Sequence, residues 1–231
     1  MRKYQQPPYG EPLSSSFVYA AWSIDPLRVG PFVRASAVRA QQIDKIRGVA
    51  PELAQRADVE GVRVFEASFL PPLPGMPKYD VVMLVRARTG EGAADIRDDA
   101  QLRGLGPATV FSATNAARFG DTETPGSGVN ILLNHFVGPT DRSAAVDTWR
   151  QISGWYVAKT GVDNSTLLCA EEDAPYVVVN YVRIPGAVVS FMLQQVLRPS
   201  FYRYVRALLK GHRLTSLPLF VRNLPLGSAD A

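Results

Sequence analysis

Three polar residues in the C-terminal half of the chain have side chains that could act on a small molecule. Asn134 and His135 lie in the apolar segment NILLNHFV (130–137), and Asn180 lies in the apolar segment YVVVNYVR (176–183). A buried amide can donate a hydrogen bond to an oxygen that becomes negative, and a neutral histidine can remove a proton near pH 7. These residues are therefore our candidates for catalysis at a site where an enolate or phenolate oxygen forms.

Aromatic and cationic residues of the same half could bind the substrate of such a site. Large aromatic side chains form the apolar walls of small-molecule pockets, and a guanidinium can neutralise a developing negative charge. The candidates for substrate binding are Phe136, Trp155, Tyr156, Tyr181, Arg183 and Tyr202. The expected partner is a small hydrophobic or aromatic molecule.

The alternation of side chains along a strand limits how these residues can combine. Asn134 and His135 are adjacent, so a regular strand points them to opposite faces, and they cannot line one pocket without a bulge. Asn180 joins Asn134 on one face if their strands pair in register. A purely structural interpretation also stands, in which the asparagines bond to each other and His135 donates to a carbonyl. We favour the asparagine pair over the histidine as the site.

The sequence has no motif for a metal or a nucleotide cofactor. Two histidines and one cysteine give no zinc-type spacing, and no glycine-rich phosphate-binding motif occurs. The acidic run 171–173 fits a solvated turn, and Cys169 fits a small core residue better than a nucleophile. We therefore expect neither a metal nor an organic cofactor.

Composition and charge are those of a folded protein without a macromolecular ligand. Of 231 residues, 46% are apolar, and the net charge of +4 comes from basic residues scattered along the chain. The densest basic stretch, 198–213, interleaves arginines with aromatic residues, and an amphipathic helix explains it better than a nucleic-acid surface. No apolar run reaches the roughly 20 residues that span a bilayer, and the N-terminus lacks a secretory signal. We expect a cytoplasmic protein that binds neither nucleic acid nor membrane.

An internal repeat indicates how the candidate residues are positioned. The segment YDVVMLVR (79–86) shares a tyrosine, three valines and an arginine with YVVVNYVR at matching positions. Each half of the chain then shows the order strand, helix, strand, strand, helix, strand. In the first half we expect these elements at 17–24, 36–56, 62–69, 79–86, 93–102 and 108–114. In the second half we expect a strand at 130–137 and then a helix that Asp141 or Ser143 caps and Gly161 ends. Two strands at 165–172 and 176–183 follow, then a helical region at 186–209 with a break near Pro199, and a last strand at 214–221.

A polar connection separates the two halves. The segment FGDTETPGSG (119–128) has little to bury and reads as a linker. The expected organisation is a flexible N-terminal arm (1–15), a first unit (16–118), the linker (119–128), a second unit (129–222) and a C-terminal tail (223–231).

The candidate polar residues belong to the second unit alone. Met83 stands in the first unit where Asn180 stands in the second. Leu133, Asn134 and His135 have Ala20, Ala21 and Trp22 as their rough counterparts. A duplicated protein that keeps one working site would show this asymmetry.

The repeated unit predicts an α+β fold. A βαββαβ unit forms a four-stranded antiparallel sheet of strand order 4-1-3-2, with both helices on one face. Two tandem ferredoxin-like units can cover their bare faces by packing sheet against sheet. Over residues 16–222 this plan resembles the dimeric α/β-barrel superfamily, as an intramolecular barrel within one chain. The alternative is a duplicated fold whose halves lie side by side.

The resemblance implies a function and a site. Similar members of the superfamily include antibiotic-biosynthesis monooxygenases and polyketide cyclases, which act on flat phenolic substrates without metal or flavin. These proteins use an asparagine on the first strand and a tryptophan on a helix, positions that Asn134 and either Trp149 or Trp155 would take. We therefore expect a cofactor-independent monooxygenase or cyclase that acts on an aromatic or polyketide-like molecule.

Two other functions stay open. Heme-degrading monooxygenases also have this fold, but they call for an axial histidine on the second helix, and residues 191–209 contain none. Tyr202 or Tyr204 could replace it only as a tyrosinate. The other alternative is a binding or scaffold protein without catalysis. The fold is also compatible with a homodimer.

Overall fold

The computed structural model describes residues 3–123 and 129–226. The strands are β1 (Tyr9–Gly10), β2 (Ser16–Trp22), β3 (Arg28–Val29), β4 (Phe32–Val33), β5 (Val59–Phe69), β6 (Val81–Ala87), β7 (Thr109–Phe119), β8 (Asn130–Val137), β9 (Ser165–Ala170), β10 (Val178–Arg183) and β11 (Thr215–Leu224). The helices are α1 (Ala37–Ala54), α2 (Gly90–Arg97), α3 (Ala100–Gly104), α4 (Arg142–Thr160), α5 (Val188–Val196), the π-helix η1 (Phe201–Arg206) and α6 (Ala207–Gly211).

Both halves of the chain form the sheet that the repeat predicts. In the first half the strands lie in the order β7-β2-β6-β5, and in the second half in the order β11-β8-β10-β9. In each half this is the fourth, first, third and second strand of the unit, and every pairing is antiparallel. The prediction of two ferredoxin-like units is confirmed.

The two sheets also join at their edges, which the sequence did not predict. Strand β7 pairs with β9, and β11 pairs with β5, so eight strands close into one barrel. The two sheets face each other across the barrel interior, as expected for an intramolecular α/β barrel. Closure leaves neither sheet with an open edge at the seams, and open edges promote aggregation.

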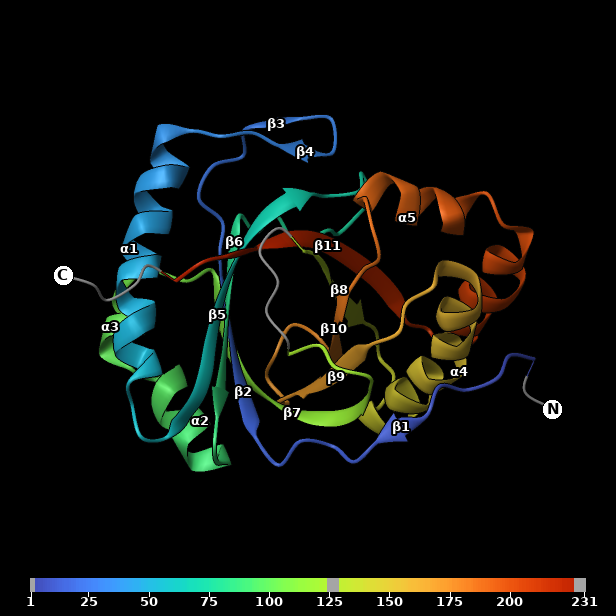
Figure 1. The fold of residues 1–231 in the computed structure, drawn as a ribbon, viewed down its shortest axis with the longest axis horizontal. Helices are drawn as coiled ribbons and strands as arrows, with labels where there is room; N and C mark the ends of the chain where they lie inside the picture. Colours follow the sequence, from blue (N-terminus) through green and yellow to red (C-terminus); the bar gives the residue numbers. More distant parts are fainter. Residues whose placement is uncertain (1–2, 124–128, 227–231) are drawn as a thin grey trace.

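Side-chain alternation divides the core into an interior and two outer layers. Odd-numbered residues of β8 and β10, such as Leu133 and Tyr181, fill the barrel interior together with Tyr19 and Leu84 of the first unit. Even-numbered residues of the same strands pack under α4 to α6. Figure 1 shows α1, α2 and α3 on one side of the barrel and α4 and α5 on the opposite side.

Helix ends follow the sequence signals. Helix α4 is capped by Asp141, whose side chain accepts from the backbone N–H of Ala144, and it ends at Gly161 with φ +73°. Glycine adopts this left-handed conformation without steric cost. The predicted break near Pro199 is confirmed, because α5 ends at Val196 and helical structure resumes at Pro199, just before η1.

The N-terminal segment packs against both units, pairing with β7 of the first and contacting α4 of the second. Tyr9–Gly10 pairs with β7, and the Tyr9 hydroxyl lies 2.6 Å from Ser153 Oγ of α4. A Cβ on Gly154 would lie 2.5 Å from the Gln5 carbonyl oxygen, so a glycine is required where the segment crosses α4. The domain boundaries stay a prediction, and parts of the expected linker (124–128) and tail (227–231) lie outside the described residues.

Pairing corrects the match between first strands. Asn134 faces Asn180 across β8 and β10, while Ala20 faces Met83 across β2 and β6. Because Met83 is the counterpart of Asn180, Ala20 is the counterpart of Asn134. The sequence comparison therefore placed the counterpart of Asn134 one residue too late, at Ala21. The two first strands share no identical residue at matching positions, so nothing in the sequence fixed their alignment.

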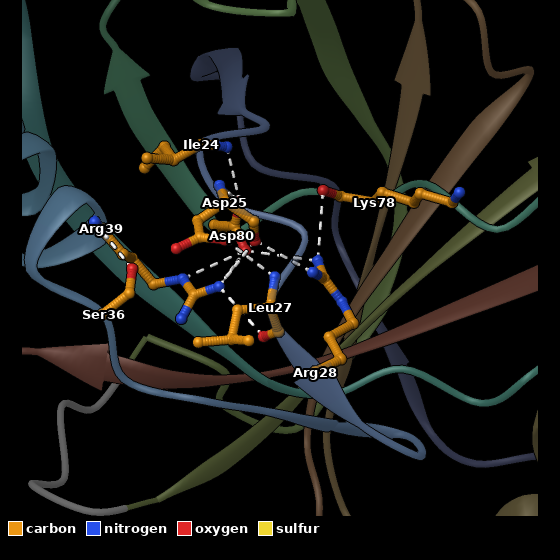
Figure 2. A network of polar contacts seen from close by, with 8 residues as sticks. All are labelled: Ile24, Asp25, Leu27, Arg28, Ser36, Arg39, Lys78 and Asp80. Carbon is orange, nitrogen blue, oxygen red and sulfur yellow. Dashed lines mark hydrogen bonds and ion pairs between the residues drawn. The ribbon is translucent and has the colours of Figure 1, made fainter.

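A buried ion pair anchors α1 to the barrel. Asp80, just before β6, lies 3.1 Å from the Arg39 guanidinium of α1, and both side chains are 1% exposed. The other Asp80 oxygen accepts from the backbone N–H groups of Ile24 and Asp25. Figure 2 shows these groups converging on Asp80, together with Arg28 at 3.3 Å. The carboxylate thus connects α1, β6 and the segment after β2.

Candidate functional site

The two candidate asparagines lie side by side on the helix-facing surface of the second sheet. Asn134 of β8 and Asn180 of β10 are direct partners in the antiparallel register, as predicted. Both side chains point toward α4 and α5 rather than into the barrel. Cross-strand partners have Cβ atoms about 5 Å apart, so the two amides can contact one ligand atom.

The asparagines do not bond to each other. Asn180 Oδ1 accepts from Trp149 Nε1 at 3.0 Å and from the Ser165 hydroxyl. An indole N–H only donates, so Trp149 requires the amide oxygen of Asn180 on its side and turns the NH2 group away from itself. Asn134 Oδ1 accepts from the Ser216 hydroxyl at 2.7 Å. In each amide the oxygen has a partner, and no described residue accepts from the NH2 group.

A small cavity lies beside the asparagine pair, between the sheet and the helices. Its volume is about 30 Å³, roughly the share of one water molecule. Besides the two asparagines, its walls include Phe119, Phe136, Trp149, Tyr156, Val182 and Phe191. Tyr156 and Phe191 stack with ring centroids 6.4 Å apart and close it on the helix side. The site is therefore a polar pair of donors within an aromatic enclosure.

Among the residues that line the cavity, the ionisable side chain is Tyr156. Burial raises the pKa of its phenol far above the ordinary value, so it stays neutral. Its hydroxyl donates to Gln195 Oε1 at 3.1 Å. The cavity has no described group that would take a proton at neutral pH.

His135 lies on the other side of the sheet, inside the barrel. Its Nδ1 is 3.2 Å from the Leu217 carbonyl, which only accepts, so Nδ1 carries the proton. Nε2 then accepts from the Tyr19 hydroxyl at 2.7 Å. Burial lowers the pKa of His135 to about 4, so the ring is neutral at pH 7. Asn134 and His135 therefore do not share a pocket, and the expected histidine-to-carbonyl bond is confirmed.

Tyr181 and Arg183 also lie away from the cavity, toward one end of the barrel interior. The Tyr181 hydroxyl accepts from Arg63 at 2.9 Å and donates to the Thr122 carbonyl at 3.1 Å. Arg183 donates to the backbone carbonyl of Asp121. Their place follows from alternation, since odd-numbered residues of β10 face the interior.

The remaining candidates lie on the helices. Trp155 is fully buried and donates to Ser200 Oγ at 3.0 Å, outside the cavity wall. Tyr202 is 50% exposed, and its hydroxyl donates to the Val196 carbonyl. The structure thus brings Asn134, Asn180, Phe136 and Tyr156 together at the cavity. Sequence reasoning missed Ser165 and Ser216, because single serines in strands carry no distinguishing signal.

Solved structures share this architecture across nearly the whole chain. An anthrone oxidase-like protein aligns with a TM-score of 0.61 at 11% identity, over 95% of this chain and 96% of its own. The chain has the dimeric α/β-barrel fold. A protein of presumed monooxygenase function from Fusobacterium nucleatum aligns with a TM-score of 0.55 at 8% identity, covering 91% and 92%. Chlorite dismutase from Candidatus Nitrospira defluvii aligns with a TM-score of 0.52 at 11% identity, covering 92% of both chains.

Sequence comparisons add no closer relative. No known sequence family and no curated protein matches the chain. Identities this low establish the fold, and they leave substrate and reaction to be argued from the site. None of the described helices is long and apolar enough to cross a membrane.

The helices above the cavity offer no fitting ligand for a heme iron. The cavity of about 30 Å³ holds neither a heme nor an aromatic ring without opening, so it is the available ligands that disfavour heme. No histidine lies on α5, η1 or α6. The hydroxyls of Tyr202 and Tyr204 donate to the backbone carbonyls of Val196 and Gln151. Iron ligation would require each phenol to lose the proton that forms this hydrogen bond.

The bond between Trp149 and Asn180 can be tested by a double-mutant cycle. Trp149→Phe removes the N–H donor and is expected to cost about 1 kcal/mol of unfolding free energy. In a chain that also carries Asn180→Leu, the same change should cost about 1 kcal/mol less, because the bond is already lost. Urea unfolding measures both. Trp155→Phe with Asn180→Leu is the control pair and should be additive, since Trp155 donates to Ser200.

Proposed function

We propose that the cavity beneath α4 and α5 binds a small planar aromatic molecule with a carbonyl or phenol oxygen, and that the protein oxygenates or cyclises this molecule without a cofactor. The observation that carries the proposal is the pair of amide NH2 groups of Asn134 and Asn180. Both are left without a described acceptor, while both amide oxygens are occupied. Neighbours of the same fold that are described as anthrone oxidase-like or as a presumed monooxygenase support this choice.

The amide pair would act on the charge of the bound oxygen. Two N–H donors aimed at one oxygen stabilise its anionic form, and they do so more strongly in an enclosure of aromatic side chains than in water. The acidity of the ligand would rise on binding. Because the cavity has no described base at neutral pH, the proton would pass to water. The resulting electron-rich enolate is the form that reacts with dioxygen or attacks a carbonyl to close a ring.

The cavity must open before a ligand can bind. Phe191 of α5 and Tyr156 of α4 fill the space that an aromatic ring would need. Helix α5 has no side-chain cap at its N-terminus, and it buries only Phe191 and Gln195. A short helix with so few buried anchors can shift at low cost in free energy. Ligand entry is therefore expected to displace α5 and turn the Phe191 ring outward.

A specific observation favours a second candidate, a binding protein without catalysis. Tyr156 is the ionisable residue on the described cavity wall, and its raised pKa keeps it from acting as a base. A protein that only stores or carries an aromatic ligand needs no such group. The two candidates share the site and differ in whether the bound molecule is changed.

Asn180→Asp tests the site with a change of nearly equal size. The carboxylate keeps an acceptor for Trp149 and Ser165 but replaces the NH2 donor with a negative oxygen. With anthrone in air-saturated buffer as the probe, we expect the rate of oxygen uptake and quinone absorbance to fall at least tenfold. Asn134→Asp should behave alike. Asn223→Asp on β11 is the matched control and should keep the wild-type rate.

The outcomes separate the candidates. An unchanged rate in Asn180→Asp would remove the asparagine pair from the site. Quenching of tryptophan fluorescence by anthrone without oxygen uptake would favour the binding protein, provided that Asn180→Asp weakens the quenching. Wild-type protein that neither binds nor converts the probe or related hydroxylated anthrones would contradict both.

A further inference from the structure

Helix α5 has its apolar residues on the outside. Seven of its nine residues are not buried, and the two buried ones are Phe191 and Gln195. The exposed positions include Val189, Leu193, Val196 and Leu197, the last at 73% exposure. Their spacing of four, three and one residues places them on one stripe of the helix. We call these four residues the outer stripe of α5.

The chain around this stripe is basic. From Ala174 to Ala229 the sequence contains no aspartate or glutamate but seven lysines and arginines. Arg203, Arg206, Lys210 and Arg213 follow α5 directly and are exposed. None of these four forms an ion pair with an acidic residue in the described part of the chain.

In the first unit, by contrast, several arginines form ion pairs with aspartates. Arg56, Arg97 and Arg103 each lie within 3.3 Å of a carboxylate oxygen of an aspartate. The positive charge beside α5 is therefore a local property of the second unit and does not follow from the modest net charge of the chain. An exposed apolar stripe that is followed in the sequence by exposed cations without an ion-pair partner is typical of a segment that lies in a lipid–water interface.

In contrast to the expectation from the sequence that the protein binds no membrane, we propose that the outer stripe of α5 docks on the surface of an anionic lipid bilayer. The four aliphatic side chains would enter the boundary between head groups and acyl chains, and the four basic residues would contact lipid phosphates. Tyr202 is half exposed, its hydroxyl donates to the Val196 carbonyl of α5, and it has the amphipathic ring that is enriched at this depth. The helix would lie on the membrane and would not span it. This proposal does not depend on the proposed function.

Other occupants fit this surface less well. A second copy of the chain would bring two copies of the basic segment 203–213 together, and like charges oppose such a contact. Nucleic acid would use several exposed aromatic rings for stacking, whereas the outer stripe is entirely aliphatic and the ring of Tyr202 is only half exposed. An anionic bilayer complements both the stripe and the charge.

Vesicle sedimentation tests the proposal with the full chain. The protein should sediment with vesicles that contain about 30% phosphatidylglycerol and stay in solution with neutral phosphatidylcholine vesicles. Leu193→Gln and Leu197→Gln should each weaken binding about tenfold. Arg203→Gln and Arg206→Gln should each weaken it about fivefold, and salt of about 0.5 M should abolish the difference between lipids.

Matched surface variants serve as controls. Val38→Gln and Lys45→Gln change an exposed aliphatic residue and an exposed basic residue of α1, and they should leave binding unchanged. All these positions are exposed, so the variants should keep the wild-type melting temperature.

Several results would overturn the proposal. These are a lack of binding to anionic vesicles, or binding that Leu193→Gln and Leu197→Gln do not weaken. A dimer in sedimentation velocity that both leucine changes abolish, without vesicle binding, would assign the stripe to a second copy. Retention by single-stranded DNA that depends on Arg203 and Arg206, again without vesicle binding, would assign the charge to nucleic acid.

Discussion

Replacing Asp80 by alanine is expected to lower the free energy of unfolding by about 3 to 5 kcal/mol. The change leaves the buried Arg39 guanidinium without its carboxylate, and Arg39 Nη1 already has no partner. It also removes the acceptor for the backbone N–H groups of Ile24 and Asp25. An unpaired buried charge costs far more than the loss of a surface ion pair. Urea or thermal unfolding measures the effect.

A surface pair on the same helix is the control. Asp44 and Arg47 of α1 lie 4.0 Å apart, with the Asp44 side chain 75% exposed and the Arg47 side chain 32% exposed, so Asp44→Ala should cost less than 1 kcal/mol. Replacing both partners, Arg39→Met with Asp80→Leu, should be less harmful than Asp80→Ala, because no charge is left unpaired. A cost for Asp80→Ala as small as that of Asp44→Ala would show that the buried pair does not hold α1 in place.

Lowering the pH from 7 to 4 is expected to remove about 3 kcal/mol of unfolding free energy through His135 alone. The folded protein holds this ring neutral until about pH 4, whereas the ordinary pKa is 6.5. Between these values the unfolded chain binds one proton more, so stability falls as the pH falls. Above pH 6.5 and below pH 4, His135 does not make the free energy of unfolding depend on pH.

His135→Phe should remove this slope between pH 4 and 6.5. The variant will be less stable at pH 7, since Tyr19 and the Leu217 carbonyl lose a partner. The quantity to compare is therefore the change of the unfolding free energy with pH, not its value at one pH. His212→Gln, which changes the other histidine, should keep the wild-type slope. Asp98, whose pKa is held at about 2 by Arg97 and Arg103, contributes only at lower pH. An equal slope in His135→Phe would place the acid sensitivity elsewhere.

The repeated valine pattern was enough to predict the fold. The matches between 79–86 and 176–183 identified two equivalent strands, and alternation then placed Asn134 and His135 on opposite faces. These inferences depend on local periodicity, which the strand imposes whatever surrounds it. The pairing of Asn134 with Asn180 followed from the strand order and was confirmed.

Long-range relations could not be predicted in the same way. The sequence left Trp149 and Trp155 as equal candidates, and only the rotation of α4 against the sheet turns Trp149 toward Asn180. The pairing of Asp80 with Arg39, which is 41 residues away, has no local signal. The helical period also gave no warning that α5 would bury Gln195 and expose Leu193.

Barrel closure has a consequence for how the chain reaches its native state. The seam between β11 and β5 pairs Val221 with Ala67, so β11 completes a ladder with a strand that lies more than 150 residues earlier in the chain. Closing so long a loop costs entropy before any pairing energy is gained, which slows topologies of this kind. A nascent chain would hold β5 with one edge unpaired until β11 has been synthesised. The barrel is therefore complete only when β11 has been made, and completion of the first unit alone does not close it.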